Sequence, residues 1–164
     1  MEESTSQQEL TAPQKIKYEI IFIASNPEHD KHYADENLCD EFSSQFKRPS
    51  DLRKELERVK NDGEKIEDLF SSLRDDDFLI QDDIRDFAGM GEDSDINPEW
   101  SRNYESKSKC IQVQDGSWVG WTYWYGGGKH GCPEDIAWID DAYNVRLLKT
   151  EYVPKRFFEK VEEE

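Results

Sequence analysis

The 164-residue sequence has few of the residues that would cross-link or anchor a small protein. Its three cysteines, Cys39, Cys110 and Cys132, are sparse and odd in number, which is typical of reduced thiols in a cytosolic protein. No apolar run approaches the roughly 18 residues of a membrane span. The acidic start MEESTSQQELTAPQ lacks the basic and apolar segments of a signal peptide. We therefore expect a cytoplasmic protein without membrane association.

Positive charge is also scarce. Lysine and arginine number 21 against 38 aspartates and glutamates, which gives a net charge of −17. Because nucleic-acid binders gain affinity by neutralising phosphates, this charge argues against direct binding of nucleic acid. The expected partner is a protein with a basic surface, such as one that itself binds polyanions.

Motifs of known chemistry are missing as well. The sequence contains neither G-x-S-x-G nor H-E-x-x-H. The segment GGGKHG at residues 126–131 fails as a phosphate-binding loop, because Lys129 is followed by His130 where Ser or Thr is required. We predict a non-enzymatic protein without a cofactor.

A metal site remains an open alternative. The sequence offers four side chains of the types that bind zinc: His29, His32, His130 and Cys132. Their spacings, His-x2-His and His-x-Cys, are not those of common zinc fingers. A site would form only if the fold brought the two halves together.

The apolar pattern predicts a disordered tail at residues 1–14 and a single α+β domain at residues 15–164. The segment KIKYEIIFIAS alternates and then becomes an apolar, β-branched run, which predicts a central strand at 15–25. Apolar residues three and four apart predict helices at 34–46, 49–61 (with Ser50 as N-cap) and 64–74. Further strands are predicted at 108–114, 117–125 and 143–152, and further helices at 133–142 and 154–164. The expected fold is a mostly antiparallel sheet of about four strands with helices packed on one face.

An aromatic block dominates the last third of the chain, where residues 116–145 hold four of the five tryptophans. Asp115-Gly116 predicts a two-residue type I′ hairpin before it. In the following strand, Val119 and Trp121 would share one face and Trp118 and Trp124 the other. Either both faces are buried, or one is a protein interface, where aromatic anchors are enriched. Under the second interpretation the partner contacts are Trp118, Trp121, Tyr123, Trp124, Tyr125, Lys129 and His130.

Acidic residues concentrate in residues 75–99. This segment carries ten acidic side chains and one arginine, a charge of −9 in 25 residues. The acids either keep one face solvated or steer the protein onto a basic partner. The docking residues predicted here are Asp75, Asp76, Asp77, Asp82, Asp83 and Asp86.

The size, the acidity, the opening IKYEIIFIASNPEHD and the aromatic-glycine block at 117–131 resemble the small acidic early proteins of T-even-like phages. Among them the chain looks most like the Pin type, which inhibits the host ATP-dependent protease Lon. The resemblance implies a non-enzymatic inhibitor that binds a host enzyme in the host cytoplasm. A DNA mimic that antagonises a nucleic-acid-binding or defence protein is the alternative, as is a small metal-binding or enzyme domain.

Overall fold

A computed structural model of the chain describes residues 9–27, 48–73, 85 and 91–158. Its elements, in chain order, are α1 (Ala12–Ala24), α3 (Pro49–Val59), α4 (Gly63–Ser71), β1 (Glu92–Asp93), β2 (Glu105–Gln112), β3 (Trp118–Tyr125), the 3₁₀ turns η4 (Gly128–His130) and η5 (Pro133–Asp135), and β4 (Tyr143–Val145). The strands form one antiparallel sheet in the order β1-β2-β3-β4. The predicted α+β fold with a four-stranded antiparallel sheet is confirmed.

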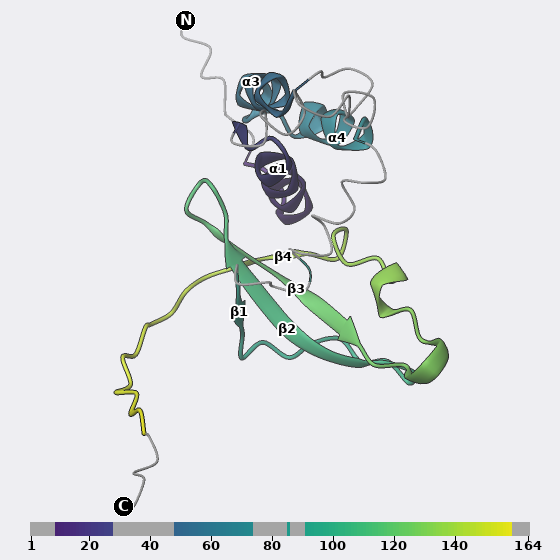
Figure 1. The fold of residues 1–164 in the computed structure, drawn as a ribbon, viewed down its shortest axis with the longest axis vertical. Helices are drawn as coiled ribbons and strands as arrows, with labels where there is room; N and C mark the ends of the chain where they lie inside the picture. The colour runs from purple at the N-terminus through teal and green to yellow at the C-terminus, as the bar shows by residue number, and fades with distance from the viewer. Residues whose placement is uncertain (1–8, 28–47, 74–84, 86–90, 159–164) are drawn as a thin grey trace, which may run out of the picture.

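Helix α1 lies between the sheet and the other two helices (Figure 1). One side of α1 packs on the sheet through a first buried cluster: Ala12, Ile16, Ile20, Ile111, Val113, Val119, Trp121 and Trp138. Its opposite side packs on α3 and α4 through a second: Ile21, Leu52, Leu56, Val59, Ile66 and Leu69. The helices therefore form two layers on one face of the sheet.

The predicted strand at 15–25 is wrong, since this segment is α1. A helix that is covered on two sides is apolar around most of its circumference, so its sequence loses the 3.6-residue period. The run Ile20–Ala24 then looks like a buried strand.

The start of α1 also corrects the predicted tail. Thr11 and Gln14 form a capping box, in which the Gln14 N–H donates to the Thr11 hydroxyl at 3.4 Å and the Thr11 N–H donates to the Gln14 amide oxygen at 3.0 Å. The helix begins at Ala12. Residues 11–14 thus belong to the folded domain.

Helices α3 and α4 lie where the sequence predicts helices, at 49–61 and 64–74, but the N-cap of α3 and the first residue of α4 differ from the prediction. Helix α3 begins at Pro49, whose fixed φ suits the first turn, and Arg48 rather than Ser50 is the N-cap. Helix α4 begins at Gly63 after Asp62, whose carboxylate accepts the Lys65 N–H at 3.1 Å. The helix predicted at 34–46 lies outside the described residues.

The β2–β3 hairpin is present, with Gln112 opposite Trp118, but its turn differs from the prediction. The Val113 N–H donates to the Ser117 carbonyl and the Gly116 N–H to the Val113 carbonyl, both at 2.9 Å. The loop therefore has three residues, with Gly116 in the left-handed region at φ 84°. The Asp115 carboxylate holds this longer loop by accepting the Ser117 N–H at 2.8 Å.

The last part of the chain has less regular structure than predicted. The helix expected at 133–142 is only the short turn η5, and the strand expected at 143–152 ends at Val145. Residues 146–158, which we call the C-terminal arm, have no regular secondary structure and extend away from the body (Figure 1). The helix predicted from residue 154 is therefore wrong as far as residue 158, because no described residue covers the arm's apolar side chains, which an amphipathic helix would have to bury. None of the helices in the described ranges has the length and apolarity needed to cross a bilayer.

Candidate protein-binding surface

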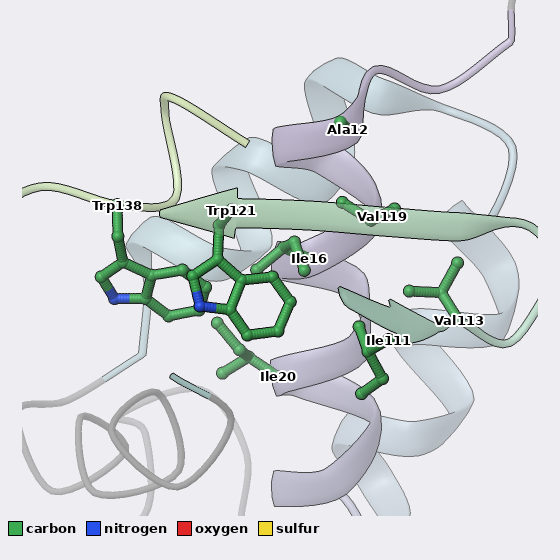
Figure 2. Packing of buried hydrophobic residues seen from close by; sticks show 8 residues of the cluster. All are labelled: Ala12, Ile16, Ile20, Ile111, Val113, Val119, Trp121 and Trp138. Carbon is green, nitrogen blue, oxygen red and sulfur yellow. The ribbon is translucent and has the colours of Figure 1, made fainter. Parts of the chain in front are cut away.

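The aromatic strand supplies the core on the face that meets α1. Trp121 is fully buried, and its ring centroid lies 5.2 Å from that of Trp138, which follows η5 (Figure 2). Ile16 and Ile20 of α1 pack in the same cluster. The prediction that Trp121 contacts a partner is wrong, because this side chain has no surface to offer.

The opposite face of β3 is buried too, so the prediction for Trp124 is also wrong. Trp124 is 7% exposed, and its carbonyl accepts a hydrogen bond from the Arg85 guanidinium at 3.0 Å. Beside it, the Thr122 hydroxyl accepts the Glu99 N–H at 3.4 Å. The segment after β1 therefore runs over this face of the sheet.

Three aromatic side chains of the strand stay half-buried: Trp118, Tyr123 and Tyr125. The rings of Tyr123 and Tyr125 stack with their centroids 5.7 Å apart, and the Lys107 ammonium lies 5.4 and 5.9 Å from the two centroids. This pairing satisfies the rings locally. A role for these three residues in partner contact stays a prediction.

The glycine segment after β3 is a tight turn built around one tyrosine. Gly126, Gly127 and Gly128 all have positive φ. A Cβ on Gly127 would lie 2.4 Å from Cε1 of Tyr104, whose hydroxyl accepts the Cys132 N–H at 3.4 Å. Glycine is therefore required at this position both for its backbone angle and for space.

The turn leaves two predicted contact residues, Lys129 and His130, exposed. Cys132 is exposed as well, while His29 and His32 lie outside the described residues. Among the residues that the structure does describe, no three His, Cys, Asp or Glu side chains are grouped as a metal site would require. The alternative zinc site is neither formed nor tested by these residues, so it stays a prediction.

All six predicted acidic docking residues lie outside the described residues: Asp75, Asp76, Asp77, Asp82, Asp83 and Asp86. The described end of the acidic segment, from Glu92 onward, runs into a loop whose tryptophan is not among the predicted partner contacts.

That loop, residues 94–104, carries Trp100 and is called here the Trp100 loop. Trp100 is 84% exposed and Ile96 is 41% exposed. The sequence signal was available: this tryptophan stands alone in the polar segment DINPEWSRN, outside the aromatic block. With only Ile96 and Pro98 as apolar neighbours in this segment, Trp100 belongs to no periodic apolar pattern that would place it in a core.

Hydrogen bonds hold the Trp100 loop on the sheet at its start and at Glu99, in its middle. The Ser94 N–H donates to the Ser108 carbonyl at 3.0 Å, which continues the β1–β2 pairing. The Ser106 hydroxyl donates to the carbonyl of Glu99, and the Glu99 N–H donates to Thr122. The residue immediately before Trp100 is thus fixed to both central strands, so the indole extends from an ordered backbone.

Several carboxylates lie near Trp100 in the sequence. Asp93 is neutralised by Lys109, at 2.6 Å, and by Lys107, at 3.8 Å, and the Lys109 hydrogen bond holds the pKa of Asp93 below its usual value. The other acids near the loop, Glu92, Asp95 and Glu99, are exposed, and none has an ion pair within the described ranges. The loop therefore combines one large exposed apolar side chain with two exposed carboxylates, Asp95 and Glu99, and one exposed arginine, Arg102.

Comparison with known proteins gives no relative from which a site could be transferred. No family model, no curated protein and no solved structure matches the chain. The candidate surface rests on the chain's own geometry.

Proposed function

We propose that the protein is a non-enzymatic binding protein that inhibits a host enzyme by docking the Trp100 loop on it. The observation that carries the proposal is the 84% exposure of Trp100 on a backbone hydrogen-bonded to β2 and β3. Tryptophan is enriched among the residues that dominate binding energy. A loop that is ordered before binding also loses less conformational entropy in a complex.

The acids of the Trp100 loop indicate the chemistry of the partner surface. Asp95 and Glu99 would face lysine or arginine side chains around a pocket that receives the indole. With a net charge of −17, the whole chain would be drawn toward such a surface. The resemblance to Pin-type proteins makes an ATP-dependent protease of the Lon class the first target to test.

The test measures binding of the full chain to a purified Lon-class protease and the inhibition of its proteolysis. We expect the wild-type chain to inhibit, and Trp100→Ala to weaken binding at least about tenfold, as for an interface anchor. Tyr152→Ala is the matched control, because it removes a 95% exposed aromatic ring from a different segment. The control is expected to inhibit like the wild type.

Two failures are distinguishable. If Trp100→Ala inhibits as strongly as the wild-type chain, the Trp100 loop is not the contact surface. If the wild-type chain does not bind the protease, the target is wrong. Capture from a nuclease-treated bacterial lysate at moderate salt, with wild type and Trp100→Ala in parallel, then identifies a partner that depends on Trp100.

Charge steering gives a second measurement on the same complex. The double change Asp95→Asn and Glu99→Gln removes two unpaired carboxylates without altering size. The association rate should fall and depend less on salt, while the dissociation rate changes little. An unchanged salt dependence would show that these acids do not face the partner.

A further inference from the structure

The C-terminal arm differs from the rest of the chain in both charge and exposure. Residues 146–158 carry four basic side chains and one glutamate, a charge of +3, so the remaining residues carry −20. Six of its large apolar side chains are exposed: Leu147, Leu148, Tyr152, Val153, Phe157 and Phe158. The basic stretch ends at Arg156, since the last six residues hold four glutamates and one lysine.

The apolar residues of the arm have no cover within the described residues. Phe157 and Phe158 are 82% and 89% exposed, and the nearest cation to Phe157 is Lys155, 5.3 Å from its ring centroid. A contiguous exposed stretch of this kind marks a contact segment. Its basic and aromatic end, Lys155–Phe158, would bind an apolar groove with acidic edges.

The body of the same chain has such a groove, with a volume of about 550 Å³, between α4, α1 and residues 134–140. Its apolar lining comes from Phe70, Ile136, Ala137, Trp138 and Ile139. Its charged lining is Glu134, Asp135 and Asp140 against a single Lys17, a net charge of −2. The volume lies within the roughly 300–1,000 Å³ of concave binding sites.

Ion pairs within the described residues neutralise only some of the groove's carboxylates. Lys17 lies 3.7 Å from Asp140 and also pairs with Glu67 of α4. Glu134 and Asp135 are exposed and form no ion pair in the part of the chain that the structure describes. They are therefore available to Lys155 and Arg156.

The arm and the groove lie on different sides of one molecule. In Figure 1 the arm leaves β4 toward the left, whereas residues 133–140 lie at the right. The arm is thus extended away from its own groove.

We propose that the C-terminal arm of one copy binds the acidic groove of a second copy, with Phe157 and Phe158 on the apolar lining and Lys155 and Arg156 at Glu134 and Asp135. If both arms exchange around a two-fold axis, each copy gives one arm and accepts one, and the assembly closes as a dimer. The proposal goes beyond the proposed function, since it uses neither the Trp100 loop nor an external target.

The first test is sedimentation velocity of the full chain over a range of concentrations. The wild type should form a dimer whose dissociation constant rises with salt, because the contact includes charge pairs. The double variant Phe157→Ser, Phe158→Ser should raise the dissociation constant at least about tenfold. Both side chains are more than 80% exposed, so the variant is expected to keep the wild-type circular dichroism spectrum.

The second test exchanges charges between the two surfaces. Arg156→Glu alone and Asp135→Arg alone should each weaken the dimer, whereas a mixture of the two variants should associate, because the glutamate of one arm then meets the arginine of the other groove. Failure of the mixture to associate more tightly than either variant alone would overturn the assignment of the groove.

Three further results would overturn the proposal. They are a wild type that remains monomeric at every concentration, association that is unaffected by the two arm serines, and an arm that folds back in its own molecule. The last is seen if the wild type is monomeric at all dilutions and the arm variants nevertheless change the fluorescence of the groove tryptophan, Trp138.

Discussion

Trp121 and Trp100 mark the two extremes of tryptophan exposure in the described chain, at 0% and 84%. Trp121 lies in a strand crowded with aromatic residues, and Trp100 lies alone among acids and polar residues. The crowded tryptophan is core and the isolated one is surface. Trp121 is buried because α1 and Trp138 supply apolar neighbours, whereas Trp100 lies in a mostly charged and polar segment that supplies few.

The two residues also differ in what holds them. Trp121 is held by side chains of α1, by Val119 and by Trp138. The position of Trp100 is set by hydrogen bonds of its neighbour Glu99 to β2 and β3. Removal of the Trp121 ring should therefore lower the free energy of unfolding, and removal of the Trp100 ring should affect only partner binding.

The largest expected effect is that of Trp121→Ala. Loss of a fully buried aromatic side chain typically costs about 3–5 kcal/mol in the free energy of unfolding, from lost burial and from the cavity left behind. Urea unfolding followed by circular dichroism measures it. Trp121→Phe, which keeps a ring beside Trp138, should lose less. A loss below about 1 kcal/mol for the alanine variant would contradict the assignment of Trp121 to the core.

The glycine turn after β3 offers a matched pair of alanine substitutions, at Gly127 and at Gly128. Gly127 and Gly128 have φ values of 85° and 73°, so alanine at either should cost about 1 kcal/mol for the left-handed conformation. Only at Gly127 does the new Cβ meet Tyr104, at 2.4 Å, while Gly128 has no atom within 4 Å. Gly127→Ala should therefore be less stable than Gly128→Ala by about 1–3 kcal/mol in the same urea assay. Equal losses would mean that Tyr104 moves aside without strain.

The sequence predicted the helices whose burial is one-sided. Helices α3 and α4 each bury one stripe, Leu52–Leu56–Val59 and Ile66–Leu69, and their 3- and 4-residue spacing was visible. Strand β2 was visible from its alternation, and β3, which is buried on both faces, from the Asp115-Gly116 turn before it. Helix α1 was mistaken for a strand because it is covered on two sides, which is a property of the assembled fold and not of the segment.

The candidate surface was predictable in its chemistry but not in its residues. Acidity and aromatic residues indicated a protein contact, yet Trp121 and Trp124 were assigned to it from strand alternation alone. Alternation shows which side chains share a face but not what covers that face. The face of β3 that carries Trp124 is covered in part by the segment that leads to Trp100. The hydrogen bonds of Ser94 with Ser108 and of Glu99 with Thr122 place that segment on the sheet, and the sequence does not show them.

A smaller effect on stability is expected from the buried carboxylate of Glu19. Glu19 of α1 is 3% exposed; Gln114 donates to its Oε1 at 2.9 Å, and its Oε2 has no hydrogen-bond partner within the described residues. Burial raises the pKa of Glu19 above its usual value of 4.5. The charged form is thus disfavoured in the folded state.

Glu19→Gln should make the chain more stable at neutral pH by about 1 kcal/mol, because a neutral amide costs less to bury than a carboxylate. Below about pH 4.5, the usual value, Glu19 is protonated in both states and the penalty is absent. The penalty grows as the pH rises through the raised folded-state pKa, so the gain from Gln should grow over the same range. Urea midpoints of both proteins from pH 4 to pH 7 measure this, and a gain independent of pH would contradict it.

The smallest expected change in stability is that of Trp100→Ala. An 84% exposed side chain leaves no cavity, so the free energy of unfolding should change by no more than about 0.5 kcal/mol. The hydrogen bonds of Glu99 with the Thr122 and Ser106 hydroxyls use its backbone N–H and carbonyl, which the substitution keeps. The same variant should lose partner binding, which makes it the reverse of Trp121→Ala. If Trp100→Ala instead costs several kcal/mol, the indole is covered in solution, and the ring would then belong to the core together with Trp121.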